Sequence, residues 1–69
     1  MDLAIIGSRL VSFRKAKGIF QTKLAELTKR DRTYISRIER GKQNMTMTTL
    51  IFICDCLGVT LKELFDFEE

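Results

Sequence analysis

The sequence predicts an all-α fold, a compact bundle of five short helices, on three observations. Apolar residues recur at helical spacings of three and four, and no stretch alternates apolar and polar residues as a strand does. The chain contains no proline, and three of its four glycines stand where a helical pattern ends. Its length is that of one domain, so residues 1–69 are expected to fold as a unit.

The first predicted helix covers residues 3–17. Asp2 can cap its start, because an aspartate oxygen accepts a hydrogen bond from the free N–H groups of a first turn. Gly18 can end it in the left-handed conformation that glycine tolerates. Three apolar residues share one face of this helix: Ile6, Leu10 and Phe13.

The second predicted helix covers residues 21–28 and begins without a local cap. Phe20 stands where serine or threonine would be expected, and the missing cap is expected to cost on the order of 1 kcal/mol. The free N–H groups at this end would suit a phosphate oxygen. Ala25 is small enough to let a crossing helix approach closely, and residues 29–31 form the turn that follows.

The third predicted helix, residues 32–40, separates apolar from polar residues. Asp31 caps it, and Ile35 and Ile38 share the apolar face because they are three positions apart. The opposite face carries hydrogen-bond donors: Arg32, Thr33, Ser36, Arg37 and Arg40. Three guanidinium groups on one stripe suit phosphates and base edges. This pattern indicates the recognition helix of a helix-turn-helix that binds duplex DNA.

The fourth predicted helix covers residues 47–57 after a loop that follows Gly41. Thr46 can cap its start, and four residues face inward: Leu50, Ile53, Cys54 and Leu57. Thr60 and Glu63 have the spacing of a capping box, which predicts a fifth helix over residues 61–65.

Apolar residues outside the core face of the fourth helix predict a subunit contact. The expected patch contains Ile51, Phe52, Leu61 and Phe67. We therefore expect a two-fold homodimer through the fourth and fifth helices. Scattered surface apolar residues are the alternative.

The distribution of charge also favours a polyanionic partner. Residues 1–43 hold 11 lysines and arginines against 4 acidic residues, whereas residues 44–69 hold 1 against 5. A basic part beside an acidic one is expected if one side of the domain faces nucleic acid. An ordinary solvated surface with chance asymmetry remains the alternative.

The residue types that catalysis and metal binding require are scarce. There is no histidine and no glycine-rich phosphate loop, and Cys54 and Cys56 point apart on a helix, so no enzyme activity, metal or other cofactor is expected. Free thiols and the lack of a signal peptide indicate a reducing cytoplasm. No apolar run approaches the length of a membrane span.

Five short motifs occur in a fixed order from Ile6 to Phe65. They are Ile6-Gly7-x-x-Leu10, Arg14-x-x-x-Gly18, Gln21-x-x-Leu24-Ala25, Tyr34-Ile35-Ser36-x-Ile38-Glu39-Arg40-Gly41 and Leu57-Gly58-Val59-x-Leu61-x-Glu63-Leu64-Phe65. In this order they resemble the Cro/phage-repressor type of helix-turn-helix domain, called Xre-like, which has the lambda-repressor-like fold. The run from Asp31 to Ser36 is most similar to the controller proteins of restriction–modification systems, dimers that regulate their own operon.

The resemblance implies roles for the matching residues. Gln21 would anchor the second helix to a phosphate or a base. The third helix would direct four side chains into the major groove: Arg32, Thr33, Ser36 and Arg37. Further DNA contacts would come from Tyr34, Arg40, Lys42, Gln43 and Asn44. Arg14 and Glu39 would form an internal ion pair.

Three residues depart from the pattern of this family. Lys29 replaces the usual glycine or asparagine at a turn position with positive φ, where a lysine would carry about 1–2 kcal/mol of strain. Arg30 replaces an apolar residue, and its stem is expected to cover the core with its head in water. Met45 stands where proline is common.

The function expected from these observations is a sequence-specific regulator of transcription that binds double-stranded DNA with two-fold related half-sites. The dimeric autoregulatory controller of a restriction–modification operon is the favoured subclass. A phage-type repressor, an antitoxin-like regulator and a protein-interaction module remain alternatives. Contact with RNA polymerase through Glu26 or the acidic tail, residues 66–69, is left open.

Overall fold

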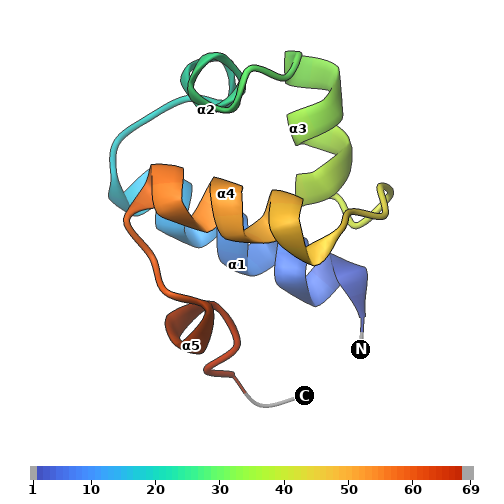
Figure 1. Ribbon diagram of the computed structural model, residues 1–69, viewed down its shortest axis with the longest axis vertical. Coiled ribbons are helices and arrows are strands. Elements are labelled where there is room, and N and C mark those ends of the chain that lie inside the picture. Colours follow the sequence, from blue (N-terminus) through green and yellow to red (C-terminus); the bar gives the residue numbers. More distant parts are fainter. Residues whose placement is uncertain (1, 68–69) are drawn as a thin grey trace.

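The structure is a computed structural model that describes residues 2–67, so residues 68 and 69 of the predicted acidic tail lie outside it. Its described part contains five helices and no strand, which confirms the predicted all-α fold. The helices are α1 (Leu3–Ala16), α2 (Gln21–Thr28), α3 (Arg32–Glu39), α4 (Met47–Leu57) and α5 (Leu61–Leu64). In Figure 1, α1 and α4 cross the middle of the molecule, α2 and α3 lie on one side of them, and α5 lies on the other.

Three helices end one residue earlier than predicted, because the expected last residue is in each case the C-cap. Lys17, Arg40 and Phe65 hold these positions after α1, α3 and α5. The chain then turns through left-handed glycines after α1 and α3, with φ of 72° at Gly18 and 73° at Gly41. A left-handed residue cannot continue a right-handed helix, so the glycines set both limits.

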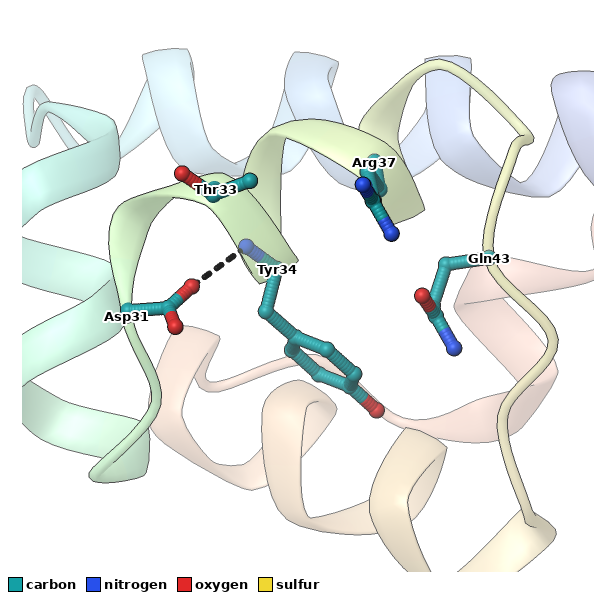
Figure 2. Close-up of a pocket in the computed structure, with 5 residues that line it drawn as sticks. All are labelled: Asp31, Thr33, Tyr34, Arg37 and Gln43. Carbon is teal, nitrogen blue, oxygen red and sulfur yellow. Dashed lines mark hydrogen bonds between the residues drawn. The ribbon is translucent and has the colours of Figure 1, made fainter.

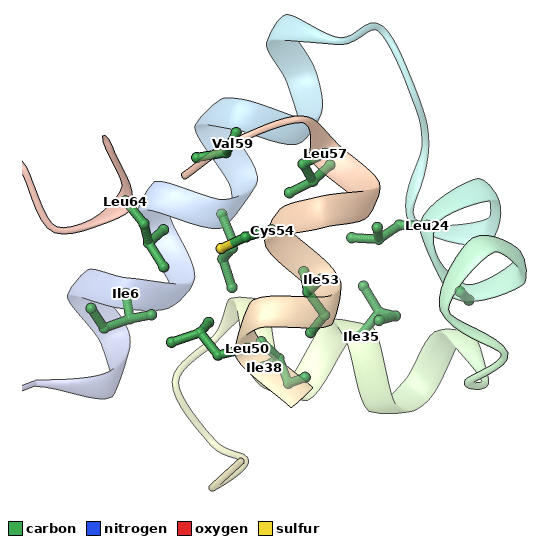
Figure 3. Close-up of a cluster of buried hydrophobic side chains, with 12 residues drawn as sticks. Ile6, Leu24, Ile35, Ile38, Leu50, Ile53, Cys54, Leu57, Val59 and Leu64 are labelled. Carbon is green, nitrogen blue, oxygen red and sulfur yellow. The ribbon is translucent and has the colours of Figure 1, made fainter. Parts of the chain in front are cut away.

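The core joins the apolar faces of all five helices (Figure 3). Its buried residues are Ile6, Leu10, Leu24, Ala25, Ile35, Ile38, Leu50, Ile53, Cys54, Leu57, Val59 and Leu64. Phe13, expected on the core face of α1, is only partly buried against this cluster. The inward side of α3 is therefore fixed to the interior, which leaves its other side for solvent.

Local side chains cap four of the five helices. Asp2 accepts from the Ala4 N–H at 2.8 Å, and Asp31 accepts from the Tyr34 N–H at 2.7 Å. Thr46 and the Thr60–Glu63 capping box act in the same way for α4 and α5. Phe20, the N-cap residue of α2, makes no side-chain capping bond.

Two glycines let α1 lie close to the carboxyl end of α3. A Cβ atom on Gly7 would lie 2.5 Å from the carbonyl oxygens of Ile38 and Glu39, and one on Gly41 would lie 2.6 Å from the backbone of Ala4. Neither contact would leave room for a larger residue. This close packing fixes where the carboxyl end of α3 sits on the domain.

In the turn between α2 and α3, Lys29 adopts the left-handed conformation that glycine or asparagine usually takes. Lys29 has φ 58° and ψ 36°, and its N–H bonds the carbonyl oxygens of Ala25 and Glu26. Arg30 is exposed, and its guanidinium lies 4.8 Å from the centre of the Tyr34 ring. The Arg30 head therefore rests on a residue of α3.

Arg9 joins α5 to α1, which the sequence did not indicate. It donates to the carbonyl oxygens of Glu63 at 2.7 Å and Leu64 at 3.2 Å. Its guanidinium also lies 5.1 Å from the Phe13 ring centre and 5.9 Å from that of Phe67. These bonds supply donors to the free carbonyl groups at the end of α5.

Candidate nucleic-acid interface

The solvent side of α3 presents the predicted donor residues. Arg32, Thr33 and Arg37 are exposed, and Ser36 is half-buried between them and the core. Arg40 is also exposed, but its Nε lies 3.4 Å from the Ser36 carbonyl oxygen of the same helix. The exposed side of α3 thus offers the guanidinium groups of Arg32 and Arg37 and the Thr33 hydroxyl to a partner.

A shallow recess opens beside this helix. It has a volume of about 230 Å³ and is lined by Asp31, Thr33, Tyr34, Arg37 and Gln43. Figure 2 shows the Thr33, Tyr34 and Arg37 side chains on α3 and the Gln43 side chain on the loop that follows. Besides the Asp31 carboxylate, the recess presents hydroxyl, phenol, guanidinium and amide groups, which are side-chain types that bind phosphate oxygens.

The loop after α3 holds three residues of the predicted set. Lys42 and Asn44 are exposed, whereas Gln43 is half-buried and donates to the Asn44 carbonyl oxygen at 3.0 Å. The Lys42 N–H bonds the Arg37 carbonyl oxygen at 2.8 Å. The loop therefore follows directly from the end of α3 and adds a lysine to its exposed arginines.

A buried ion pair connects α1 to the end of α3. Arg14 Nε donates to Glu39 Oε2 at 2.7 Å and its Nη2 donates to Oε1 at 3.1 Å. Arg14 Nη1 also donates to the Ile19 carbonyl oxygen at 2.9 Å. Both ionised side chains are buried, so each charge depends on the other in place of water. The resemblance implies this pair, but not its third bond.

Gln21 extends this pair to the start of α3. Its Nε2 donates to Glu39 Oε1 at 2.8 Å, and its Oε1 accepts from Arg32 Nη1 at 3.1 Å. The amide of Gln21 is therefore engaged at both ends inside the protein. A DNA contact by Gln21 stays a prediction, and the structure adds a positioning role for its amide that the sequence did not indicate.

The charges around α3 leave a basic surface. Glu39 is buried and paired with Arg14, and the Asp31 carboxylate caps the helix. Lys29, Arg30 and Lys42 are exposed at the two ends of α3, beside its own arginines. These exposed lysines and arginines outnumber the exposed carboxylate of Asp31, so this side would attract an anionic partner.

The predicted subunit patch is only partly exposed. Ile51 and Phe52 keep 40% and 45% of their surface in solvent. Leu61 and Phe67 are half-buried against the core, and Arg9 lies over the Phe67 ring. Two exposed residues missed by the sequence analysis, Leu27 and Met47, add to the apolar surface of α2 and α4. Their partner stays a prediction.

The two thiols have the character of interior groups. Burial, followed by the negative charge of Asp55, raises the pKa of Cys54 and of Cys56. Both thiols are free, and Cys56 Sγ lies 3.8 Å from the Leu27 carbonyl oxygen. Residues 2–67 include no group of three or more His, Cys, Asp and Glu side chains placed to hold a metal ion.

Phe20 is the most exposed large apolar residue of the described chain, with 80% of its surface in solvent. It directly precedes Gln21 and the network that holds Arg32. The missing cap on the second helix was the sequence signal that marked this position.

Among residues 2–67, no helix is long and apolar enough to cross a membrane.

The chain is similar to known proteins both in sequence and in fold. The Helix-turn-helix family matches residues 10–64. Control protein C.MunI from a Mycoplasma species is 43% identical over 60 residues, which cover 86% of this chain and 81% of the relative. The crystal structure of the restriction-modification controller protein C.AhdI from Aeromonas hydrophila has a TM-score of 0.87 at 38% identity and 93% coverage of both chains. The controller protein C.Esp1396I, solved as a tetramer in complex with its natural 35 base-pair operator, has a TM-score of 0.82 at 36% identity, over 93% of this chain and 84% of its own.

Proposed function

This chain belongs to the Helix-turn-helix family, as its motifs predicted, and from that premise we propose that it is a sequence-specific DNA-binding regulator of transcription. We infer that its subclass is the dimeric, autoregulatory controller of a restriction–modification operon, acting in the cytoplasm. The relatives named as control proteins support this subclass. The observation that carries the proposal is the exposed arginine side of α3, held at both ends by bonds to α1 and α2.

The geometry supports base contacts by some side chains of this surface and phosphate contacts by others. Arg32 and Arg37 each offer two donors, which match guanine O6 and N7 in the major groove. Thr33 can place its methyl group beside a thymine methyl. Tyr34 and Asn44 would hold phosphates at the edge of the recess, and such contacts position the protein without reading sequence.

The duplex is the expected partner because α3 has the width that a major groove admits. Phosphate neutralisation would supply most of the affinity, so binding should weaken steeply with salt. A two-fold dimer would place two copies of α3 on half-sites about one helical turn apart. Contact with RNA polymerase through the exposed Glu26 is a further proposal, supported only by the exposure of that carboxylate.

Footprinting on the DNA upstream of its own gene tests the proposed function. We expect protection of two related half-sites and a gel shift that survives excess non-specific duplex at 50 mM salt but weakens at 200 mM. Absence of a shift on this DNA and on a pool of random duplexes would contradict DNA binding. It would favour the protein-interaction module instead.

Sedimentation equilibrium tests the proposed dimer. Phe52→Glu would place a charge in the apolar patch, so we expect the mass to fall from two chains toward one. Ser12→Glu adds the same charge at an exposed position of α1 and serves as the matched control. A monomeric mass for the unsubstituted protein at micromolar concentration would contradict the dimer.

A further inference from the structure

Phe20 breaks two local rules at one position. As the N-cap residue of α2 it provides no side-chain hydrogen bond to the first turn, and its ring keeps 80% of its surface in water. A serine at this position would serve the folded domain better on both counts. Positions that work against local stability tend to be functional, so the ring is a candidate for a contact outside the protein.

The backbone on both sides of Phe20 is held in place. The preceding carbonyl oxygen, of Ile19, accepts from Arg14 Nη1 at 2.9 Å. The Phe20 carbonyl oxygen accepts from the N–H groups of Lys23 and Leu24 at 3.0 and 3.2 Å. Because its backbone is fixed, the ring projects from a defined point.

That point adjoins the proposed DNA interface. The next residue, Gln21, bonds Arg32 of the recognition helix at 3.1 Å. Residues 15–23 also contain three lysines, all exposed, and no acidic residue: Lys15, Lys17 and Lys23. An exposed ring on a stretch with three exposed lysines, of which Lys23 also lies 3.6 Å from Glu26, fits a partner that is anionic and partly apolar, which describes the sugar–phosphate backbone of DNA.

Building on the proposed function, we propose that the Phe20 ring binds the DNA backbone by packing against deoxyribose groups next to the phosphate that faces the start of α2. Duplex bases are stacked on each other, so the sugars are the apolar surface that a backbone offers to this ring. The contact adds affinity without reading sequence. It releases no counterions, since the ring neutralises no phosphate.

Three variants separate the ring from the missing cap. Phe20→Ala removes the ring and adds no cap, Phe20→Ser removes the ring and adds a cap, and Phe20→Leu keeps an apolar side chain. We expect the Ala and Ser variants to bind the same operator duplex about five- to tenfold more weakly, and the Leu variant to lose less. The slope of log affinity against log salt should stay unchanged in all three.

Thermal unfolding provides the second readout. The melting temperature should rise in Phe20→Ser, because serine caps α2, and stay near the unsubstituted value in Phe20→Ala. Weaker binding by a more stable protein cannot be explained by damage to the fold. Sedimentation of the same variants should show an unchanged mass.

The outcomes distinguish this inference from the proposed function. Equal affinity of the Phe20→Ala, Phe20→Ser and unsubstituted proteins would overturn the ring contact and leave the proposed function intact. A fall in sedimenting mass with unchanged affinity per dimer would assign the ring to a second copy of the chain, which also overturns it. No binding by the unsubstituted protein on any duplex would overturn both.

Discussion

The Arg32 guanidinium donates to the Gln21 side-chain oxygen at 3.1 Å, while the Gln21 amide nitrogen donates to Glu39 Oε1 at 2.8 Å. Glu39 in turn holds Arg14 from α1. The first exposed arginine of α3 is therefore connected to a buried ion pair through a single amide. A carboxylate can accept a hydrogen bond from the amide nitrogen of Gln21 but not from its oxygen. The bond to Glu39 therefore orients the amide so that its oxygen faces Arg32.

We predict that Gln21 and Arg32 act as a unit in DNA binding. Gln21→Met keeps the shape of the side chain and removes both hydrogen bonds, and Arg32→Ala removes the arginine. The double variant should bind about as weakly as Arg32→Ala alone, with a coupling of about 0.5–3 kcal/mol between the two sites. Affinities for one operator duplex check this.

The matched control for this cycle is Gln43→Met. The Gln43 amide bonds the Asn44 carbonyl oxygen and not Arg32, so its effect should add to that of Arg32→Ala. Additive losses for Gln21 and Arg32 as well would mean that the amide does not position the arginine.

Breaking the Arg14–Glu39 pair on one side should destabilise the domain strongly. Glu39→Met leaves the Arg14 charge buried without its partner, at a cost of about 3–5 kcal/mol. The double change Arg14→Met with Glu39→Met should recover much of that loss, because neither charge then remains. Thermal or urea unfolding measures both. A single variant that melts at the unsubstituted temperature would remove the pair from the account of stability.

Relief of the left-handed lysine should stabilise the protein. Lys29→Gly removes about 1–2 kcal/mol of backbone strain at φ 58°. Part of this gain is offset, because glycine loses more conformational entropy on folding than lysine does. We expect a net gain of about 1 kcal/mol and a rise of about 4–8 °C in Tm. Lys29→Ala loses the same charge without gaining conformational freedom. Equal melting temperatures for the two variants would count against strain at this turn.

The capping box of α5 should contribute to stability in a pH-dependent way. Hydrogen bonds from the backbone and side chain of Thr60 lower the pKa of Glu63. A carboxylate whose pKa is lowered by folding stabilises the protein above its ordinary pKa, and loses that contribution as pH falls through the folded value. Glu63→Ala should therefore lower Tm at pH 7 and change it much less at pH 3.

The control for this pH series is Glu26→Ala. Glu26 is exposed outside any cap and lies 3.6 Å from Lys23 in a surface pair, so its removal should have little effect on Tm at either pH. A Glu63→Ala deficit of the same size at pH 3 and pH 7 would exclude the ionised carboxylate as its source.

The helices could be predicted from the sequence because their limits are set locally. Asp31 lies three positions before the N–H that it caps, and Gly18 and Gly41 come directly after the C-cap residues of α1 and α3. The apolar faces follow from spacing alone. The polar side of α3 could be predicted for the same reason, since neighbours on one helix are fixed by its period.

The contacts that organise the site could not be predicted in this way. Gln21 meets Glu39 across 18 positions, and Arg9 meets Leu64 across 55. Such pairs depend on how helices cross, which periodicity does not specify. Gly7 is a further example. Its motif is visible in the sequence, but only the packed fold shows that the backbone of α3 lies too close for a larger residue there.

We propose that the exposed arginine side of α3 binds the DNA. Arg37→Gln and Lys62→Gln each remove one exposed positive charge from a net of +3, the first on α3 and the second on α5, across the domain in Figure 1. Affinity for the operator duplex should fall about tenfold or more for Arg37→Gln and change by less than about twofold for Lys62→Gln, which removes no phosphate contact. Equal losses would mean that binding follows net charge alone, and would contradict the assignment of α3 as the recognition helix.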